Sequence, residues 1–525
     1  MLDLLIRGGT VFRGDSPAEQ VDVGIADGRI VAVGGIDDEA AEVIDADGQV
    51  VCPGFINVLS HAYFTILEDP RSLSELLQGV TTQIFGEGGA LGPLSEPMQR
   101  NLEHVHAERS LAVTWSRLSE FLAHLERTGT AQNVASFVSH GTLRPYVVGY
   151  DDRPATSAEL DQMSALVAEE MADGALGVAT ALIYPPETYG STEELIALSR
   201  AAAPYGGGYI SHMRDEGSRL LEAVEELIRI GQEADVPAEI YHLKASGQDN
   251  WHLMDQVLDR VEQVRAAGQQ VKANVYPYTA SSTGLTSIIP DRFHVGGTQA
   301  LFDRLADPAA RAEIAADLRA RRRFGDTGSS DRVLVLGFRN PEFAHLQGKT
   351  LTQIAEERGT DPVDAALDLI RDDRSRVTVA FLSMSEDNLR EQIRRDWVGF
   401  GSDGSSMAPE GAVLRKPTHP RSYGTFARVL GHYVREEQVL SLAEAIRRLT
   451  VLPATTLGLS DRGRLAPGYA GDVVVFDPQR VADLATFDDP HQLAVGVSEV
   501  VVNGQVAVRG GESTGVLAGR ALRKG

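Results

Sequence analysis

Short apolar segments alternate with amphipathic helical segments from about Pro53 to Val451, and this alternation constrains the fold most strongly. A typical helical segment, Leu220–Ile230, carries apolar residues at helical spacing and acids on its other face. About eight such units in one region predict an α/β fold, a (β/α)₈ TIM barrel. A doubly wound sheet is the alternative, although no Gly-x-Gly-x-x-Gly follows an early strand. The predicted strands are Thr82–Phe85, Ala135–Val138, Gly177–Ala181, Gly208–Ile210, Ala238–Tyr241, Gln270–Asn274, Val377–Ala380 and Val398–Gly401.

Both ends of the chain show short strands rather than strand–helix units. Asp27-Gly28 and Asn503-Gly504 each separate two apolar segments, a pattern typical of tight β-hairpins. We therefore expect residues 1–52 and 456–525 to form one small β-sandwich-like subdomain beside a barrel of residues 53–455.

A stretch of about residues 285–345 interrupts the alternation. It is too long for a simple connection between two barrel units. We interpret it as an inserted lid, and a surface insertion without a role in any site is the other interpretation.

Composition and charge exclude several kinds of partner. The formal charge of −25 argues against nucleic acid and anionic membranes, because both favour an excess of Lys and Arg. The single cysteine, Cys52, permits no intrachain disulfide, and the N-terminal residues lack the regions of a signal peptide. No apolar run approaches the length of a membrane span. These features favour a cytoplasmic location and indicate no particular oligomeric state.

Two histidines closely follow neighbouring predicted strands. His212 ends the segment Gly207–His212, and His242 follows Glu239-Ile-Tyr in the next unit. Side chains at the carboxyl ends of TIM-barrel strands meet in one site, and imidazole is a favoured zinc ligand. A single histidine at such a position would more often be structural, whereas two in consecutive units favour a metal site.

Two acids occupy similar positions. Asp403 follows the predicted strand Val398–Gly401, where a carboxylate could act as a general base, or could simply cap a helix. Glu87 lies in a glycine turn after Thr82–Phe85 and is either a third metal ligand or a solvent-facing loop acid.

The chain also resembles the amidohydrolase superfamily, and within it most closely the D-aminoacylases, which are N-acyl-D-amino-acid deacylases. The resemblance begins at Pro53-Gly-Phe-Ile-Asn57 and covers nearly the whole chain in order. The other segments that carry it are Gly79-Val-Thr-Thr82, Leu182-Ile-Tyr-Pro-Pro186, Ser211-His-Met-Arg-Asp-Glu-Gly217, His242-Leu-Lys-Ala-Ser-Gly247, Tyr276-Pro-Tyr-Thr-Ala-Ser-Ser-Thr-Gly-Leu285, Gly401-Ser-Asp-Gly404, His419-Pro-Arg-Ser-Tyr-Gly-Thr425 and Ala466-Pro-Gly-Tyr-Ala-Gly-Asp472.

This resemblance implies roles for particular residues. His212 and His242 would hold the main zinc ion, and Asp403 would shuttle a proton. The carboxylate of an acylated amino acid would be bound by Arg421, Tyr276 and Ser282, and the planar fork of arginine suits a carboxylate. Ordinary strand packing for Tyr276 and Ser282, and a surface ion pair for Arg421, are the structural alternatives.

Lys244 lies two residues after His242 in the same segment. It would either polarise a group in the substrate site or form a structural ion pair.

The sequence departs from the family pattern at two metal-ligand positions. The superfamily usually places His-x-His after the first barrel strand, but this chain has Leu59-Ser-His61, so a ligand to a second metal ion is missing. The D-aminoacylases also place a Cys after the next strand, where this chain has Gly86-Glu87-Gly-Gly89. We therefore expect one zinc ion per chain, with Glu87 supplying oxygen in place of sulfur. His61, the second histidine of the family's pair, is expected at the metal site, where it would help to position Asp403 or the water.

The resulting hypothesis is zinc-dependent hydrolysis of the amide bond of N-acyl-D-amino acids. The preference for the D hand comes only from the resemblance. Other C–N hydrolases on the same scaffold, acting on a cyclic imide, a dipeptide or a C-terminal amide, are alternatives. Leu59 and the missing cysteine also leave open a non-catalytic protein that binds a small molecule.

Overall fold

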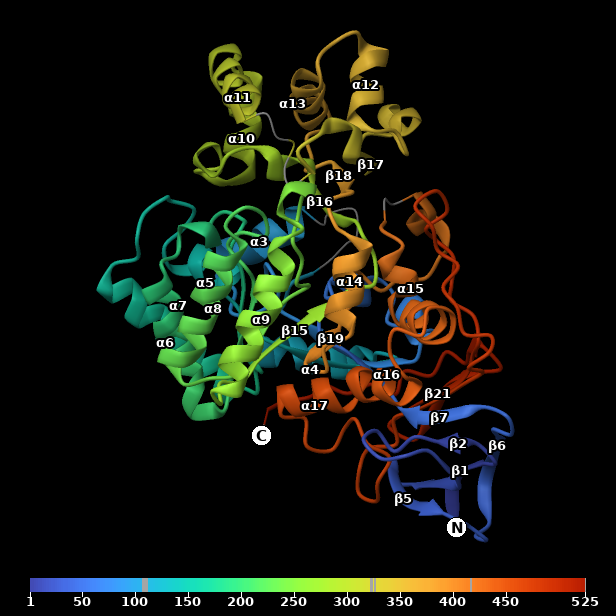
Figure 1. The fold of residues 1–525 in the computed structure, drawn as a ribbon. Helices are drawn as coiled ribbons and strands as arrows, with labels where there is room; N and C mark the ends of the chain where they lie inside the picture. The colour runs from blue at the N-terminus through green and yellow to red at the C-terminus, as the bar shows by residue number, and fades with distance from the viewer. Residues whose placement is uncertain (106–111, 322–323, 325–326, 416–417, 525) are drawn as a thin grey trace.

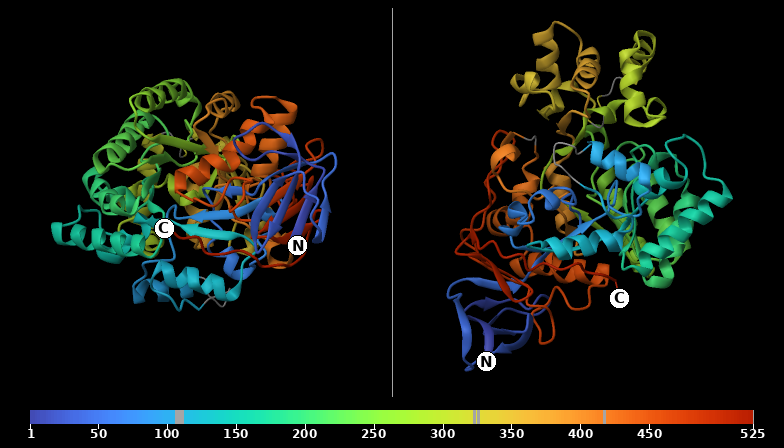
Figure 2. Two further views of the ribbon diagram at one scale, coloured as in Figure 1. Left: turned by 90° about the horizontal axis from the view of Figure 1, so that it is seen from below. Right: turned by 180° about the vertical axis from the view of Figure 1, so that it is seen from behind.

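The computed structural model describes residues 1–105, 112–321, 324, 327–415 and 418–524, and places three parts in a row (Figure 1). A barrel of strands and helices occupies the middle. A helical insertion lies at one end of the barrel, and strands from both termini lie at the other. Figure 2, seen from behind, shows the same order.

The barrel has eight parallel strand positions within the described residues, one of which is formed by β10 and β11 together. Each neighbouring pair in the order below is hydrogen-bonded in parallel, and β10 continues into β11 through Phe137. The barrel closes where Asp403 N donates to Leu59 O and His61 N donates to Gly404 O, both at 2.9 Å. The strands are β8 (Phe55–Asn57), β9 (Val80–Phe85), β10 (Asn133–Ser136) with β11 (Val138–Ser139), β12 (Gly177–Ala181), β13 (Gly208–His212), β14 (Ala238–Ile240), β15 (Val271–Val275) and β19 (Val398–Phe400).

Amphipathic helices surround these strands, as their spacing of apolar residues predicts. In α8, for example, Leu220, Val224 and Leu227 are buried while the acids point outward. No helix in the described part of the chain is long and apolar enough to span a bilayer. The helices around the barrel are α4 (Leu118–Thr128), α5 (His140–Val147), α6 (Ser157–Ala172), α7 (Thr192–Ala202), α8 (Leu220–Ala234), α9 (Leu253–Ala266), α14 (Glu386–Ile393), α15 (Arg421–Arg428), α16 (Leu442–Leu449) and α17 (Val451–Leu457).

An apolar cluster fills the inside of the barrel. Ile56, Leu59, Ile84 and Ile210 belong to it and are almost completely buried. The barrel is therefore a packed core rather than a pore, and a ligand can enter only above the carboxyl ends of the strands.

The strands from the two termini form two sheets that face each other across an apolar core, as predicted. The N-terminal strand β7 (Val50–Pro53) pairs antiparallel with the C-terminal strand β20 (Val473–Phe476), which joins the two ends of the chain in one sheet. The orders are β5-β4-β1-β6 and β23-β22-β21-β20-β7-β2-β3. The other strands are β1 (Leu2–Arg7), β2 (Thr10–Val11), β3 (Glu19–Gln20), β4 (Asp22–Ala26), β5 (Arg29–Gly34), β6 (Ala40–Asp45), β21 (Val497–Val502), β22 (Gln505–Arg509) and β23 (Glu512–Ser513).

Both predicted hairpins are confirmed. Asp27 and Gly28 join β4 to β5, and Asn503 and Gly504 join β21 to β22. All four residues have positive φ, which is the backbone conformation that two-residue type I′ hairpin turns require.

The insertion has its own sheet and core. Strands β16 (Ser281–Gly284), β18 (Thr378–Phe381) and β17 (Val333–Gly337) pair antiparallel in that order. Buried residues of β17 and β18 pack with four helices in an apolar cluster separate from the barrel's. The helices are α10 (Gly297–Ala306), α11 (Pro308–Arg321), α12 (Leu351–Arg358) and α13 (Pro362–Asp373).

Two sequence predictions need correction here. The segment Val377–Ala380 was predicted to be a barrel strand, but it belongs to β18 and pairs with β16 and β17. The insertion consequently runs beyond the predicted end near residue 345, as far as β18. β15 instead pairs directly with β19, and the eighth barrel strand is β8, which has only three residues and lies between β19 and β9.

Candidate metal and substrate site

The candidate ligands lie just beyond the carboxyl ends of barrel strands. His212 ends β13, and Glu87 and His242 each lie two residues after β9 and β14. Glycine is required at position 86 because φ is +141° and an added Cβ would lie 2.7 Å from Phe137 Cβ. This tight approach turns Glu87 toward the barrel axis.

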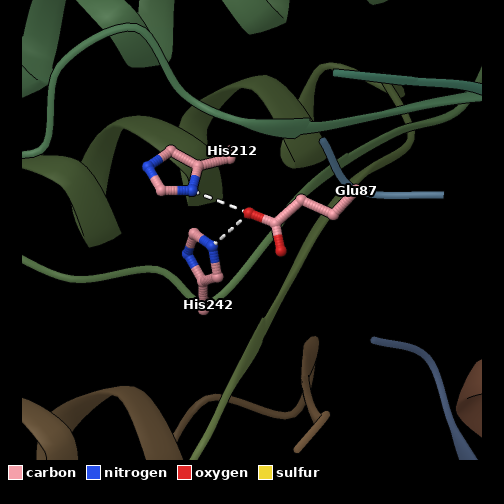
Figure 3. Close-up of side chains that lie close together, drawn as sticks. All are labelled: Glu87, His212 and His242. Atoms are coloured by element: carbon pink, nitrogen blue, oxygen red, sulfur yellow. Dashed lines mark hydrogen bonds and ion pairs between the residues drawn. The ribbon is translucent and has the colours of Figure 1, made fainter. Parts of the chain in front are cut away.

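Glu87 lies between the two histidines (Figure 3). Its Oε1 is 2.7 Å from His212 Nδ1 and 2.9 Å from His242 Nε2. All three side chains are buried, with at most 5% of each residue exposed. The structure thus brings together the three residues predicted to share one metal ion.

Glu216 faces the outer nitrogens of both rings, and only its contact to His242 is within hydrogen-bonding distance. Its Oε1 is 3.2 Å from His242 Nδ1, and its Oε2 is 3.6 Å from His212 Nε2. A carboxylate on the outer nitrogen of a metal-binding histidine fixes the tautomer and the ring orientation. Sequence analysis did not single out Glu216, although it lies within the quoted segment Ser211–Gly217.

Lys244 does not extend freely into the site. Its Nζ donates to Glu216 Oε1 at 2.6 Å and is 2.7 Å from His242 Nδ1. Of the two predicted possibilities, the contacts favour the structural ion pair.

A second group of donors adjoins the first. His61 Nε2 lies 3.0 Å from both Glu87 Oε2 and Asp403 Oδ1. Leu59, at the position where the family pattern has another histidine, is 1% exposed and packs inside the barrel. The second group therefore has one imidazole where the family pattern would supply two.

Electrostatics keep the acids of the site ionised. Burial alone would raise the pKa of Glu87, but His242, His212 and His61 outweigh it and hold that pKa well below its usual value. Burial likewise opposes ionisation of Asp403, yet the charge of Arg421 leads the effects that lower its pKa. Against its own burial, His61 has its pKa raised to about 10 by its bonds to Asp403 and Glu87.

Arg421 connects Asp403 to the insertion. One guanidinium nitrogen, Nη1, lies 2.7 Å from Asp403 Oδ2, and Nη2 donates to Ser282 O at 3.3 Å. The guanidinium also lies over the Tyr276 ring, 4.7 Å from its centroid. The predicted substrate-binding residues Arg421, Tyr276 and Ser282 are thus contiguous and adjoin Asp403.

Two site residues have unusual backbones. His242 has φ of +35° and Asp403 has φ of +47°, values that non-glycine residues seldom adopt. Such strain persists only where the surrounding structure enforces it, and it is concentrated at functional sites.

All these residues line one cavity of about 650 Å³ between the barrel and the insertion. That volume is in the range of small-molecule sites. The insertion supplies part of the wall through Ile289, His294 and Leu301. Two further lining residues had no role predicted from the sequence: Tyr184, although it lies in the quoted segment just after β12, and Arg376, which no pattern links to a strand end.

The donor set fits a metal ion. Two imidazole nitrogens and a carboxylate oxygen lie within 4.8 Å of one another, and the carboxylate is ionised. Nitrogen and oxygen donors of this kind suit zinc, and three protein ligands leave a position for substrate or water.

Comparison with known proteins places this site in a family. The sequence pattern of the amidohydrolase family matches residues 42–508. The D-aminoacylase of Alcaligenes xylosoxydans xylosoxydans is 34% identical over 533 residues, covering 99% of this chain and 98% of that protein.

Solved structures agree. A D-aminoacylase with a binuclear metal centre, described as activated by one metal and attenuated by a second, is 34% identical with a TM-score of 0.83, and each chain is covered completely. The N-acyl-D-glutamate deacylase of Bordetella bronchiseptica, solved with zinc and a phosphonate inhibitor, is 30% identical with a TM-score of 0.81 over 99% of each chain. On both sequence and fold, the chain belongs to the amidohydrolase family.

Proposed function

We propose that this protein hydrolyses the amide bond of N-acyl-D-amino acids, releasing a carboxylate and a free D-amino acid. We further propose one zinc ion per chain, held by Glu87, His212 and His242. The similar proteins named D-aminoacylase and N-acyl-D-glutamate deacylase support this substrate class. The observation that carries the proposal is one cavity that joins three buried metal-binding side chains to Asp403 and Arg421.

When bound, zinc would polarise a carbonyl group and acidify a water molecule, bringing its pKa to about 7. The protein prepares for this chemistry by keeping Glu87 ionised and by orienting the His242 ring against Glu216. The buried setting strengthens these electrostatic interactions because little bulk water screens them.

Asp403 is the proton carrier in this proposal. His61 holds its Oδ1 and Arg421 faces its Oδ2, so the carboxylate has a fixed orientation toward the cavity. Its lowered pKa keeps it ionised, which is the form that can accept a proton from water. It then gives that proton to the nitrogen that leaves as the free amine.

Arg421, Tyr276 and Ser282 would bind the α-carboxylate of the substrate. A guanidinium has five N–H donors, and the contacts to Asp403 and Ser282 occupy only part of this set. Burial raises the pKa of Tyr276 well above its usual value, which keeps its hydroxyl as a neutral donor.

The test combines metal analysis with a panel of N-acetyl-D- and N-acetyl-L-amino acids. We expect about one zinc per chain and hydrolysis of the D compounds. Asp403→Asn should keep the metal and lower kcat by about 10²–10⁴-fold, the usual contribution of general acid–base catalysis. The control is Asp387→Asn at an exposed position of α14, which should leave kcat unchanged. Full activity of Asp403→Asn, or a metal-loaded protein inactive on the whole panel, would refute the proposal.

A further inference from the structure

Four lysine and arginine side chains line the described cavity: Arg214, Lys244, Arg376 and Arg421. Three of them already face a carboxylate. Arg214 Nε is 2.9 Å from Glu226 Oε2, Lys244 Nζ is 2.6 Å from Glu216 Oε1, and Arg421 Nη1 is 2.7 Å from Asp403 Oδ2.

Arg376 differs from these three. Its Nη2 donates to the Thr283 hydroxyl at 3.3 Å, and its guanidinium lies 5.5 Å from the centroid of the Tyr184 ring. No carboxylate of the described residues forms an ion pair with it. Arg376 therefore presents an uncompensated positive charge to the cavity.

The position of Arg376 is defined by its neighbours. An added Cβ at Gly284 would lie 2.6 Å from Arg376 Cβ and 2.8 Å from its Nε, so the side chain lies against this glycine. Tyr184 donates to the same Thr283 hydroxyl at 2.8 Å. Arg376 is exposed, and its guanidinium lies beside β16 at the solvent-accessible wall of the cavity.

Arg376 and Arg421 contact adjacent residues of β16. Arg421 reaches Ser282 O and Arg376 reaches the Thr283 hydroxyl, each at 3.3 Å. Because successive strand residues rise about 3.3 Å, the two arginines lie along the same short stretch of wall. The two guanidinium groups thus contact neighbouring residues of one strand that lines the cavity.

We propose that Arg376 binds a second carboxylate in the side chain of the substrate, so that the preferred substrates are N-acyl derivatives of acidic amino acids. This inference rests on the proposed function, in which Arg421 holds the α-carboxylate. The nearness of Arg376 to Arg421 places the second carboxylate on the amino-acid side of the scissile bond. A guanidinium suits this role because it can donate two parallel hydrogen bonds to a carboxylate.

The first test compares N-acetyl-D-glutamate and N-acetyl-D-aspartate with neutral N-acetyl-D-methionine. Arg376→Gln should lower kcat/KM for the acidic substrates about 10–100-fold, as expected on losing one charge-assisted contact, and change the neutral one less than about twofold. Arg376→Lys should retain part of the preference. The control is Arg374→Gln, which removes the same charge from an exposed position in the same loop and should change neither.

An equal change for acidic and neutral substrates, or no change, would overturn the proposal. So would a selective loss with N-succinyl-D-methionine, because that result would place the carboxylate in the acyl group.

A binding experiment separates this inference from the proposed function. Calorimetry with metal-loaded protein should show glutarate binding at least about tenfold more tightly to wild type than to Arg376→Gln, and butyrate binding equally weakly to both. This result with no hydrolysis of any N-acyl amino acid would refute the function and keep the dicarboxylate site. Glutarate that binds both proteins equally, or binds neither, would refute the site.

Discussion

Glu75 is a buried acid at the seam where the barrel closes. Its Oε1 accepts hydrogen bonds from Asn57 Nδ2 at 2.7 Å and from Ser402 Oγ at 2.9 Å. Asn57 ends β8 and Ser402 precedes Asp403, so this single carboxyl group joins the first strand to the last. Burial raises the pKa of Glu75 to about 8, although both hydrogen bonds oppose the shift.

This pKa predicts a pH dependence of stability. Between the ordinary value of 4.5 and about 8, the folded state keeps a proton on Glu75 that the unfolded state has released. The free energy of unfolding should therefore fall as pH rises through this window, by up to a few kcal/mol, since one pKa unit corresponds to about 1.4 kcal/mol. Glu75→Gln, which resembles the neutral carboxyl group, should lack this contribution and be more stable than wild type above pH 8.

The measurement is urea unfolding of wild type and Glu75→Gln at several pH values from 5 to 9. The exposed Glu313→Gln on α11 is the control and should follow wild type throughout. A stability difference between Glu75→Gln and wild type that stays constant with pH would mean that Glu75 ionises normally in the fold.

Individual site residues differ in how far the sequence can predict them. His212, His242 and Asp403 each follow a recognisable strand, and parallel strands bring their carboxyl ends together. Arg376 carries no such signal, because its contacts are with segments distant in the chain. Glu216 lies soon after β13, but its role depends on contacts with His242 and Lys244 of the next unit. For Lys244 the sequence allowed two interpretations, and only its distance to Glu216 distinguishes them.

At the scale of elements, the strands of the insertion carry part of the cavity wall. Val379 lies in β18, opposite Thr283 of β16 and Val335 of β17, and its side chain is fully buried. Removing its two methyl groups should destabilise the insertion by about 1–3 kcal/mol, because neighbouring side chains cannot fill the void that the mutation leaves in the core.

Val379→Ala should accordingly raise the rate of amide hydrogen exchange in residues 281–321 and 327–381. Exchange in the barrel strands should stay unchanged. The value of kcat/KM should fall because β16 carries Ser282 and Thr283, whereas zinc content should not change. The matched control, Val178→Ala in the barrel strand β12, should instead raise exchange in the barrel. Exchange that rises equally in both parts would show that the insertion does not unfold as a separate unit.

The elements also show why part of the fold could not be predicted. An apolar strand between helices has the same pattern in a barrel as in an inserted sheet, so Val377–Ala380 was assigned to the wrong one. Conversely, β8 has only three residues, and its partner β9 lies more than twenty residues further along the chain. The hairpins were predictable because Asp27-Gly28 and Asn503-Gly504 specify a turn locally.

At the scale of the whole molecule, the proposed metal site joins three separate strands. Glu87, His212 and His242 follow β9, β13 and β14, so these residues are brought together only in the folded barrel. An ion that binds the folded state alone stabilises it by mass action, by about 2.7 kcal/mol at a free concentration one hundred times Kd. The Tm of wild type should therefore rise with added zinc and fall with a chelator.

Variants test whether the zinc-dependent rise in Tm comes from the proposed site. Glu87→Gln removes the anionic ligand and should abolish most of the zinc-dependent rise in Tm, whereas Asp403→Asn should retain it if Asp403 carries protons rather than metal. A second group, formed by Glu386, His432 and Glu437 outside the cavity, has metal-ligand spacing but lies beside Arg390, whose positive charge opposes a cation. His432→Ala should therefore leave the shift unchanged. A rise that survives in Glu87→Gln and disappears in His432→Ala would assign the zinc to the surface group, and the proposed hydrolase would then lack its metal.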